Sequence, residues 1–243
     1  GVTFGITMFI TLMGFMTGLN GLLDGLILNR TPHIRLYNEL EASDKQPIEQ
    51  HPDYSNHLLM QRSIKPMDRG RGLYNGGAAL EALKQDPRVL GVAPKTQSQV
   101  FYHVGTTDIN GLVQGIDLVE EERLFHVSDY IVKGELEGLK RVENGIILGY
   151  GIAEKMLADL GDMVQVSSAT GEKATLKIVG LYQSGLAEVD NSQSYVSIAT
   201  AQKLAGQGAG YFTDLQLKLH DLNRAPELAK EFAAVYRTQA LDI

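Results

Sequence analysis

The sequence contains no cysteine among its 243 residues, which excludes a disulfide framework and thiolate metal sites. It also lacks an excess of basic residues: Lys and Arg number 22 against 29 Asp and Glu, so the formal net charge is −7. Because no basic stripe is present to neutralise phosphates, we expect no nucleic-acid partner. The rest of the composition, 44% hydrophobic and 21% charged, is typical of a globular protein with one large domain or two small ones.

Charge is almost missing from the first 28 residues, where Asp24 is the one ionisable side chain. Residues 1–23 form an uncharged apolar run that can cross a bilayer as a helix, since about 20 residues at about 1.5 Å each match about 30 Å of hydrocarbon. We therefore predict a transmembrane helix over residues 1–28 and a water-facing domain over residues 29–243. A secretory signal and a buried helix of a soluble protein are the alternatives; neither a basic segment nor a small-residue cleavage site is visible. The chain starts at Gly1 without an initiator methionine, so we expect an excerpt of a longer polypeptide.

Glycines recur in this segment in pairs four residues apart, so each pair shares a helix face: Gly1 with Gly5, Gly14 with Gly18, and Gly21 with Gly25. Small residues at that spacing let two transmembrane helices approach backbone to backbone. Glycine is also common in membrane helices without any such role, and the spacing alone does not decide between the two interpretations. The positions predicted to pack in the membrane are Gly14, Gly18, Gly21 and Gly25.

The water-facing part mixes strand-like alternation with helical periodicity. We predict strands over residues 33–37, 89–94, 100–104, 112–116, 145–149, 163–167, 175–182, 193–198 and 214–219, with a turn over residues 105–111. We predict helices over residues 75–85, 152–160, 200–204 and 225–236. Residues 41–72 are broken by three prolines and are predicted to be an irregular connection with a short strand at 58–62. Strand–helix–strand material at both ends, around a strand-rich block, predicts an α+β domain split by an insertion.

For two of these elements the pattern also predicts which side chains face the core. In the first strand, Ile34 and Leu36 are expected to point inward. In the last helix, one apolar stripe is expected to face the core, made of Ala225, Leu228, Ala229, Phe232 and Val235.

Motifs that carry chemistry are missing. The nearest approach to a P-loop is residues 171–174 (GEKA), which lack both the spacing and the hydroxyl, and no G-x-S-x-G or H-E-x-x-H occurs. Among six histidines none has a metal-ligand spacing, and His51 and His57 are expected to be solvated in the irregular connection. The acidic run at 120–122 is expected to be a solvated face. We therefore predict no enzyme, no metal and no cofactor, and instead a binding, transport or mechanical role.

Several segments carry a resemblance to a known family. Residues 15–36 (FMTGLNGLLDGLILNRTPHIRL) resemble the end of the first transmembrane helix, and the exit into the periplasm, of LolC/LolE-type permeases, within the wider MacB/FtsX group of ABC transporters. Residues 112–117 (LVQGID) resemble that group's hydrophobic–x–Gly–Ile–Asp strand end, and residues 144–149 (NGIILG) resemble a second motif. The pattern continues at Ala153, Leu160, Gly161, Asp162, Val179, Gly180, Gly185, Val189, Asp190, Tyr195, Val196, Ala201 and Gln202.

The resemblance implies a four-span permease in the bacterial inner membrane, of which this excerpt is the first span and the large periplasmic loop. That loop would have a βα porter lobe at about 30–98 and 208–243, split by a strand-rich sabre lobe at about 99–207. The implied partners are a cytoplasmic ABC ATPase subunit, a second permease subunit forming a homo- or heterodimer, the lipid bilayer, and a periplasmic or outer-membrane partner. The implied function is to couple ATP hydrolysis to periplasmic movements that release or export a lipoprotein, peptide or small molecule.

One departure from the family pattern concerns residues 168–174. In LolC-type chains a protruding hairpin that captures a lipoprotein carrier lies at this place, whereas here the connection is a tight turn. This difference argues against carrier docking of that kind. The alternatives to a transport subunit are an FtsX-like regulator that activates a cell-wall hydrolase by protein contact, a single-span sensor or adhesion module, and a hydrolytic enzyme.

Overall fold

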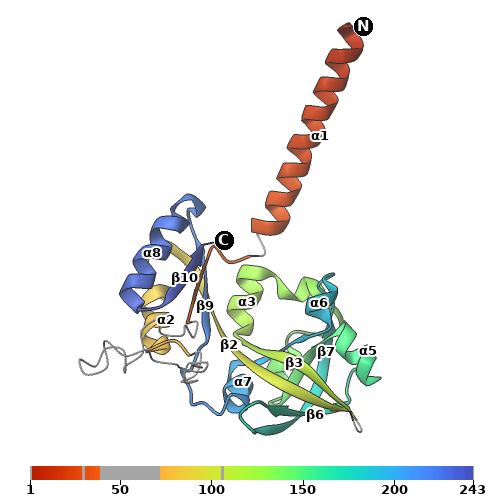
Figure 1. The fold of residues 1–243 in the computed structure, drawn as a ribbon, viewed down its shortest axis with the longest axis vertical. Helices are drawn as coiled ribbons and strands as arrows, with labels where there is room; N and C mark the ends of the chain where they lie inside the picture. Colours follow the sequence, from red (N-terminus) through yellow and green to blue (C-terminus); the bar gives the residue numbers. More distant parts are fainter. Residues whose placement is uncertain (1, 29–30, 39–71, 105–106, 243) are drawn as a thin grey trace, which may run out of the picture.

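The computed structural model describes residues 2–28, 31–38, 72–104 and 107–242. Helix α1 (Val2–Leu28) projects as a single rod from a body of strands and helices (Figure 1). The strands of the body are β1 (Ile34–Tyr37), β2 (Val89–Val104), β3 (Thr107–Ile116), β4 (Ile131–Gly134), β5 (Gly145–Gly149), β6 (Met163–Ser168), β7 (Lys173–Tyr182), β8 (Gln193–Ser197), β9 (Asp214–Leu219) and β10 (Gln239–Asp242). Its helices are α2 (Gly76–Lys84), α3 (Leu118–Phe125), η2 (Val127–Tyr130), α4 (Gly138–Arg141), α5 (Tyr150–Met156), α6 (Ala187–Asp190), α7 (Ile198–Leu204), η3 (Leu222–Arg224) and α8 (Ala225–Tyr236).

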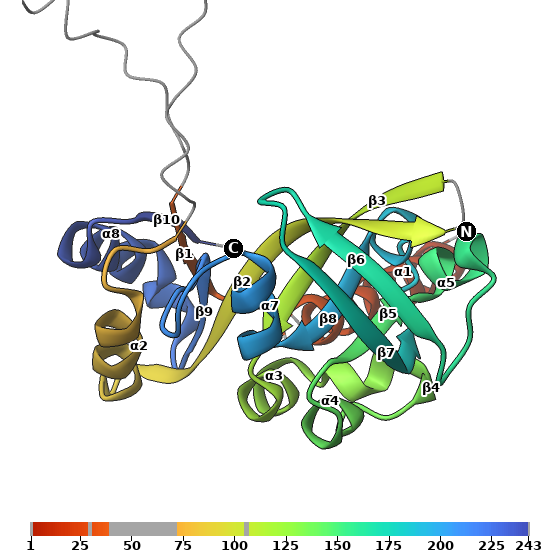
Figure 2. The ribbon, with the colours of Figure 1, turned by 90° about the horizontal axis from the view of Figure 1, so that it is seen from below.

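The described strands form one sheet in the order β10-β1-β9-β2-β3-β8-β5-β7-β4, with β6 pairing to both β2 and β7. The pairings β2–β3, β3–β8, β8–β5, β5–β7, β7–β6 and β6–β2 close a ring, so this part of the sheet is a small barrel. Strands β10, β1 and β9 extend the sheet beyond the first half of β2 as an open layer. Seen from below, the two parts lie on either side of β2 (Figure 2).

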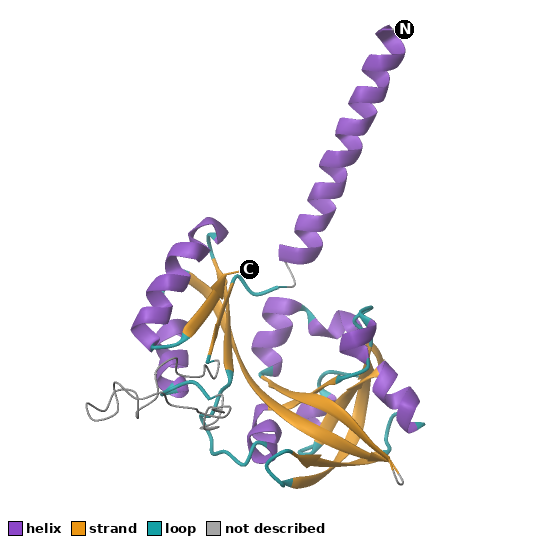
Figure 3. Ribbon diagram, viewed as in Figure 1, coloured by secondary structure: helices purple, strands orange, loops and turns teal. Residues whose placement is uncertain are grey.

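Each part has its own core. Helices α2 and α8 cover one face of the open layer, and their apolar sides pack on strands β1, β9 and the start of β2 (Figure 3). A second cluster fills the barrel with side chains from all six of its strands, among them Val100, Val113, Ile146, Val164, Leu176 and Val196. A third, smaller cluster lies beneath α3 and α4 and includes Ala93 and Ile116 from β2 and β3. The α+β architecture expected from the sequence is confirmed.

Most predicted elements are present with shifts of one or two residues at their ends. Ile34 and Leu36 are fully buried, as their alternation predicts. In α8, Ala225, Leu228, Ala229 and Phe232 are buried. Val235 is 63% exposed, so its assignment to the stripe was wrong. The core-facing place one turn after Phe232 is taken by Tyr236, since residues four apart share a face more closely than residues three apart.

The strands predicted at 89–94 and 100–104 are one continuous strand of 16 residues, β2. The prediction that the first strand ends at Pro94 was wrong for a local reason. The carbonyl of Lys95 accepts from Thr213 N at 2.9 Å on the β9 side, so the nitrogen of Pro94 points to the opposite edge. Pairing with β3 begins only at Lys95, so the missing N–H of Pro94 is not needed by the ladder. The predicted turn over 105–111 was also too long, because β3 starts at Thr107.

Other elements differ from the predictions in their length or were not predicted. The helix expected over 152–160 is α5 (Tyr150–Met156), which ends where Leu157 adopts a left-handed conformation with φ of 52°. The amide of Ala158 then donates to the carbonyl of Ala153 at 3.0 Å, a bond that closes the helix end. Helices α3, α4 and α6 and strands β4 and β10 were not predicted at all. The short strand predicted at 58–62, His51 and His57 fall outside the described residues.

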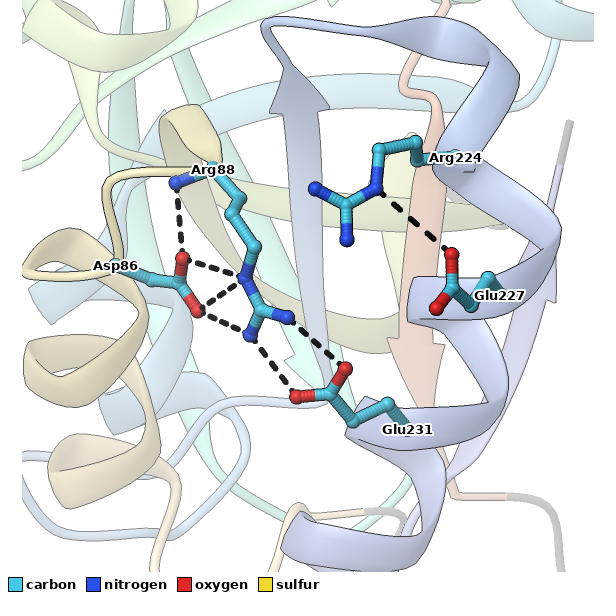
Figure 4. A network of polar contacts seen from close by, with 5 residues as sticks. All are labelled: Asp86, Arg88, Arg224, Glu227 and Glu231. Carbon is cyan, nitrogen blue, oxygen red and sulfur yellow. Dashed lines mark hydrogen bonds and ion pairs between the residues drawn. The ribbon is translucent and has the colours of Figure 1, made fainter.

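A polar network ties the turn before β2 to helix α8 (Figure 4). The Arg88 guanidinium donates from Nη2 to Asp86 Oδ2 at 2.7 Å and from Nη1 to Glu231 Oε2 at 2.9 Å, and it lies 5.4 Å from the centre of the Phe232 ring. Hydrogen bonds from Arg88 lower the pKa of the Asp86 and Glu231 carboxyls, and both carboxyls raise the pKa of Arg88. A neighbouring pair, Arg224 with Glu227, is looser at 3.8 Å.

We expect the stability that this network contributes to disappear in acid. The folded-state pKa values of Asp86 and Glu231 lie below their ordinary values of 3.8 and 4.5, so the contribution is complete above those values and is lost as the pH falls through the lowered ones. The stability difference between wild type and Arg88→Met, measured by urea unfolding followed by tyrosine fluorescence, should therefore shrink between pH 5 and pH 2.5. Arg224→Met is the control and should show a much smaller difference at every pH, because its ion pair is long and exposed.

Candidate functional sites: the apolar helix and the junction of the two parts

Helix α1 has the length and composition of a membrane span. Its window Val2–Leu19 has a mean hydropathy of 1.7, and none of that window is buried against the rest of the described chain. The exposed side chains include Phe4, Phe9 and Phe15, which are 63–77% exposed. Apolar surface of this extent is unfavourable in water and is expected to be covered by lipid or by another apolar helix.

The hydroxyl groups of α1 do not oppose insertion. Thr7 Oγ1 donates to the Thr3 carbonyl at 2.9 Å, Thr11 Oγ1 to the Thr7 carbonyl at 2.8 Å, and Thr17 Oγ1 to the Met13 carbonyl at 2.9 Å. Each of these three threonines thus satisfies its own donor within the helix, which removes most of the cost of placing it in hydrocarbon.

The glycines of α1 form a stripe. Because α1 is continuous, positions separated by four, seven and eleven residues lie on one face, so Gly14, Gly18, Gly21 and Gly25 line up. Gly5 lies on the opposite side, and Gly1 is outside the described residues. Apart from the adjacent residues and the helix's own backbone, no atom of the described chain lies within 4 Å of a Cβ placed at Gly5, Gly14 or Gly18. Whether the stripe packs against a second helix remains a prediction.

A buried ion pair marks the junction between the open layer and the barrel. Asp117 begins α3 by accepting from the amides of Val119 and Glu120, and the helix then places Glu121 inward at 2% exposure. Lys95, at the point where β2 passes from β9 to β3, donates from Nζ to Glu121 Oε1 at 2.7 Å. The prediction that residues 120–122 are a solvated face was therefore wrong at Glu121, which the helical turn directs into the protein.

A cavity of about 210 Å³ adjoins this ion pair; we name it the junction cavity. Its walls come from both parts of the body: Gln216 lies on β9, Lys95 on β2, Glu121 and Phe125 on α3, and Tyr182 and Tyr195 on β7 and β8. Burial raises the pKa of the Tyr182 and Tyr195 phenols, so both are uncharged at neutral pH. The sequence could not have indicated this site, because its residues lie up to 121 positions apart.

The structure also brings together three residues in the hydrogen-bond order of a serine hydrolase. His103 Nδ1 lies 2.6 Å from Asp108 Oδ1, and His103 Nε2 lies 2.8 Å from Ser167 Oγ. No motif predicted this trio, which cross-strand pairing of β2, β3 and β6 assembles. The Asp108 side chain is 59% exposed and that of His103 35%, so water screens these contacts, whereas efficient nucleophilic sites exclude water. We interpret the trio as a surface link between three strands.

The turn between β6 and β7 is as short as the sequence indicates. The amide of Ser168 donates to the Glu172 carbonyl at 2.8 Å, and Gly171 turns the chain with φ of 93°. Ser168 Oγ lies 2.7 Å from Thr170 Oγ1 and closes the turn. No long hairpin protrudes between these two strands, both of which lie within the described residues.

An apolar unburied helix joined to an open βα layer and a small barrel is the arrangement expected of a two-part domain carried by a membrane-spanning helix. Comparison with known families agrees, because the sequence model of the MacB-like periplasmic core domain matches residues 1–235. The chain therefore belongs to the MacB-like periplasmic core domain family.

Individual proteins are similar to this chain in sequence. The lipoprotein-releasing system transmembrane protein LolC of Neisseria meningitidis is 27% identical over 241 residues, which are 94% of this chain and 50% of that protein. LolC of Xylella fastidiosa is 26% identical over 174 residues, 68% of this chain and 41% of that protein. The chain thus spans about half the length of the curated relatives it matches. These relatives are transmembrane proteins of lipoprotein-releasing systems.

Solved structures share the fold at low identity. The periplasmic region of MacB from Actinobacillus actinomycetemcomitans superposes with a TM-score of 0.55 at 13% identity, covering 90% of this chain and 91% of that one. The extracellular domain of the ABC-type transporter YknZ from Gram-positive bacteria gives a TM-score of 0.53 at 14% identity, covering 87% of this chain and all of that one.

Proposed function

We propose that this chain is part of a permease subunit of an ABC transporter, anchored in the bacterial inner membrane by α1 with its body in the periplasm. It couples ATP hydrolysis by a cytoplasmic ABC ATPase to movements of the body that release or export a substrate of the lipoprotein, peptide or small-molecule type. A second permease subunit, identical or homologous, completes the assembly, and a periplasmic or outer-membrane partner receives the substrate. The short β6–β7 turn argues against docking of a soluble carrier at that place.

The observation that carries this proposal is how α1 enters the body. The chain passes from α1 into β1 within a few residues, and β1 pairs on one side with β10 and on the other with β9. A strand held on both sides cannot move alone, so a displacement of the foot of α1 would be transmitted to the whole open layer. Strand β10 ends beside the foot of α1 (Figure 1), an arrangement that suits a domain inserted between two membrane spans.

We assign the open layer to the porter lobe, about residues 30–98 and 208–243, and the barrel to the sabre lobe, about residues 99–207. The first core cluster draws on Ile34 to Val92 and on Phe212 to Phe232, and the barrel cluster on Val100 to Leu204, which supports these bounds. The small cluster beneath α3 contains Ala93 together with barrel-side residues and would be the contact between the lobes.

Coupling can be tested in the full-length permease purified with its ATPase in lipid nanodiscs. A four-residue Gly-Ser insertion directly after Pro32 should leave ATP hydrolysis close to wild type and abolish substrate release, because the flexible link no longer transmits motion to β1. The same insertion after Gly171, in the exposed β6–β7 turn, is the control and should leave release intact. Release that survives insertion after Pro32 would contradict mechanical coupling through β1. Activation of a co-purifying cell-wall hydrolase in place of release would favour the FtsX-like alternative.

Gly18→Leu is expected to weaken pairing between permease subunits, because a leucine on the glycine stripe prevents close approach of a second helix. Subunit exchange measured by fluorescence energy transfer in nanodiscs would report the change. Gly5→Leu is the matched control: it is the same substitution on the opposite side of α1, equally free of contacts within the chain. Equal effects of the two variants, or none, would show that the stripe is merely tolerated.

A further inference from the structure

The junction cavity contains a buried acceptor that the described chain leaves without a donor. Glu121 Oε1 is bound by Lys95 Nζ at 2.7 Å, but Glu121 Oε2 is buried and has no hydrogen-bond partner among the described residues. The Glu121 side chain is 3% exposed and lines the cavity. Leaving a buried carboxylate oxygen unsatisfied is costly, so the site favours a molecule that brings a hydrogen-bond donor.

The charges around the cavity restrict what that molecule can be. Lys95 already neutralises Glu121, and Lys95 Nζ and Lys218 Nζ lie 5.6 Å and 5.3 Å from the centre of the Phe125 ring. A further cation would be repelled by these two ammonium groups, and an anion would place its charge beside the bare oxygen of Glu121. The donor is therefore expected to be uncharged, as in a hydroxyl group or an amide.

The wall of the cavity is mixed, and its aromatic side chains favour a flat ring that also carries a polar group. Phe125, Tyr182 and Tyr195 line the cavity, and the rings of Tyr182 and Tyr195 are tilted against each other with centroids 4.8 Å apart. Aromatic rings gain from edge-to-face and offset contacts with one another. A cavity of about 150 Å³ lined by apolar side chains admits benzene, so about 210 Å³ has room for one substituted ring. The Gln216 amide adds a polar contact at the wall formed by β9.

We propose that the junction cavity binds a small, uncharged aromatic molecule of the phenol class, whose hydroxyl group donates to Glu121 Oε2 while its ring lies among Phe125, Tyr182 and Tyr195. Such a ligand touches β9 on one side and β7 and β8 on the other, so it bridges the open layer and the barrel. Nothing in the proposed transport cycle requires this ligand, and the site is therefore an additional property of the chain.

Resorcinol is a suitable probe, because it is water-soluble and carries two hydroxyl groups on one ring. Its binding to the full-length permease in nanodiscs can be followed by saturation-transfer NMR. We expect saturable binding by resorcinol, and binding at least tenfold weaker by 1,3-dimethoxybenzene, which keeps the ring and lacks the donors, by benzylammonium and by benzoate. Glu121→Gln should weaken resorcinol binding by about tenfold or more, since it replaces the charged acceptor by an amide.

The control variant is Glu120→Gln, the same substitution one residue earlier, at a side chain that pairs with Arg123 and does not line the cavity. It should leave binding unchanged. Circular dichroism spectra of both variants that match the wild type would separate loss of the site from loss of the fold. Equal resorcinol signals from wild type and Glu121→Gln would mean partition into lipid and overturn the proposal. A crystal structure soaked with resorcinol that shows only water at Glu121 Oε2 would overturn it as well.

Discussion

Replacing Lys95 by methionine is expected to lower the free energy of unfolding by about 3–5 kcal/mol, the cost of leaving a buried charge without its partner. Methionine keeps most of the length and apolar stem of lysine, so packing along β2 changes little. Glu121, however, loses Lys95 Nζ, the one donor to its carboxylate among the described residues, while its side chain remains 3% exposed. Because the pair joins α3 to the midpoint of β2, the loss should loosen the contact between the open layer and the barrel. Urea unfolding of the water-facing domain, followed by circular dichroism, measures the change.

A double substitution distinguishes the charge effect from a packing effect. Lys95→Met combined with Glu121→Leu removes both charges and leaves apolar groups of similar size beneath α3. We expect the double variant to recover most of the lost stability, since a well-packed apolar pair is often as stable as a buried ion pair. If Lys95→Met alone costs less than about 1 kcal/mol, the buried side chains must gain a partner from water, and the ion pair would not be a structural requirement of the junction.

The sequence predicts local elements of this chain well, because the forces that form them act over a few residues. Alternation in β1 and β9 and the helical stripe of α8 each follow from which side chains must avoid water. The errors occur where the context is tertiary. Pro94 looks like a strand end, because the sequence does not show that its nitrogen faces the edge of β2 where pairing with β3 has not yet begun. Val235 fits the apolar period of α8, although its side chain faces solvent.

The junction lies beyond sequence reasoning for a related reason. An acidic run usually marks a solvated surface, and nothing in residues 120–122 distinguishes Glu121 from its neighbours until Asp117 fixes the start of α3. The partner Lys95 is 26 residues away in a strand that was predicted to break at Pro94. The glycine stripe shows the opposite case: its positions could be predicted from spacing, but the described residues contain no second helix long and apolar enough to span a membrane and pack against it.

Gly149→Ala is expected to destabilise the barrel by about 3 kcal/mol, the upper part of the range for overpacking. Gly149 closes the NGIILG segment, at the point where β5 turns into α5. A Cβ at this position would lie 2.3 Å from the carbonyl oxygen of Asp190 and 2.9 Å from that of Gln193. These are backbone atoms, so they cannot move aside as a flexible side chain would. The φ of Gly149 is −60°, which alanine adopts freely, so the expected loss comes from the close approach of the α6–β8 segment and not from backbone strain.

The matched control for this last variant is Gly77→Ala in α2, where the added methyl group has no described neighbour within 4 Å besides the adjacent residues and the helix's own backbone. Alanine favours the helix over glycine, so Gly77→Ala should be neutral or slightly stabilising under the same urea unfolding measurement. The same substitution would then lower the free energy of unfolding where glycine allows two backbone segments to approach, and leave it unchanged or raise it where glycine is only tolerated. If Gly149→Ala were as stable as wild type, the β5–α5 turn must be able to move away from Asp190. Close packing would then not require glycine at the end of the NGIILG segment.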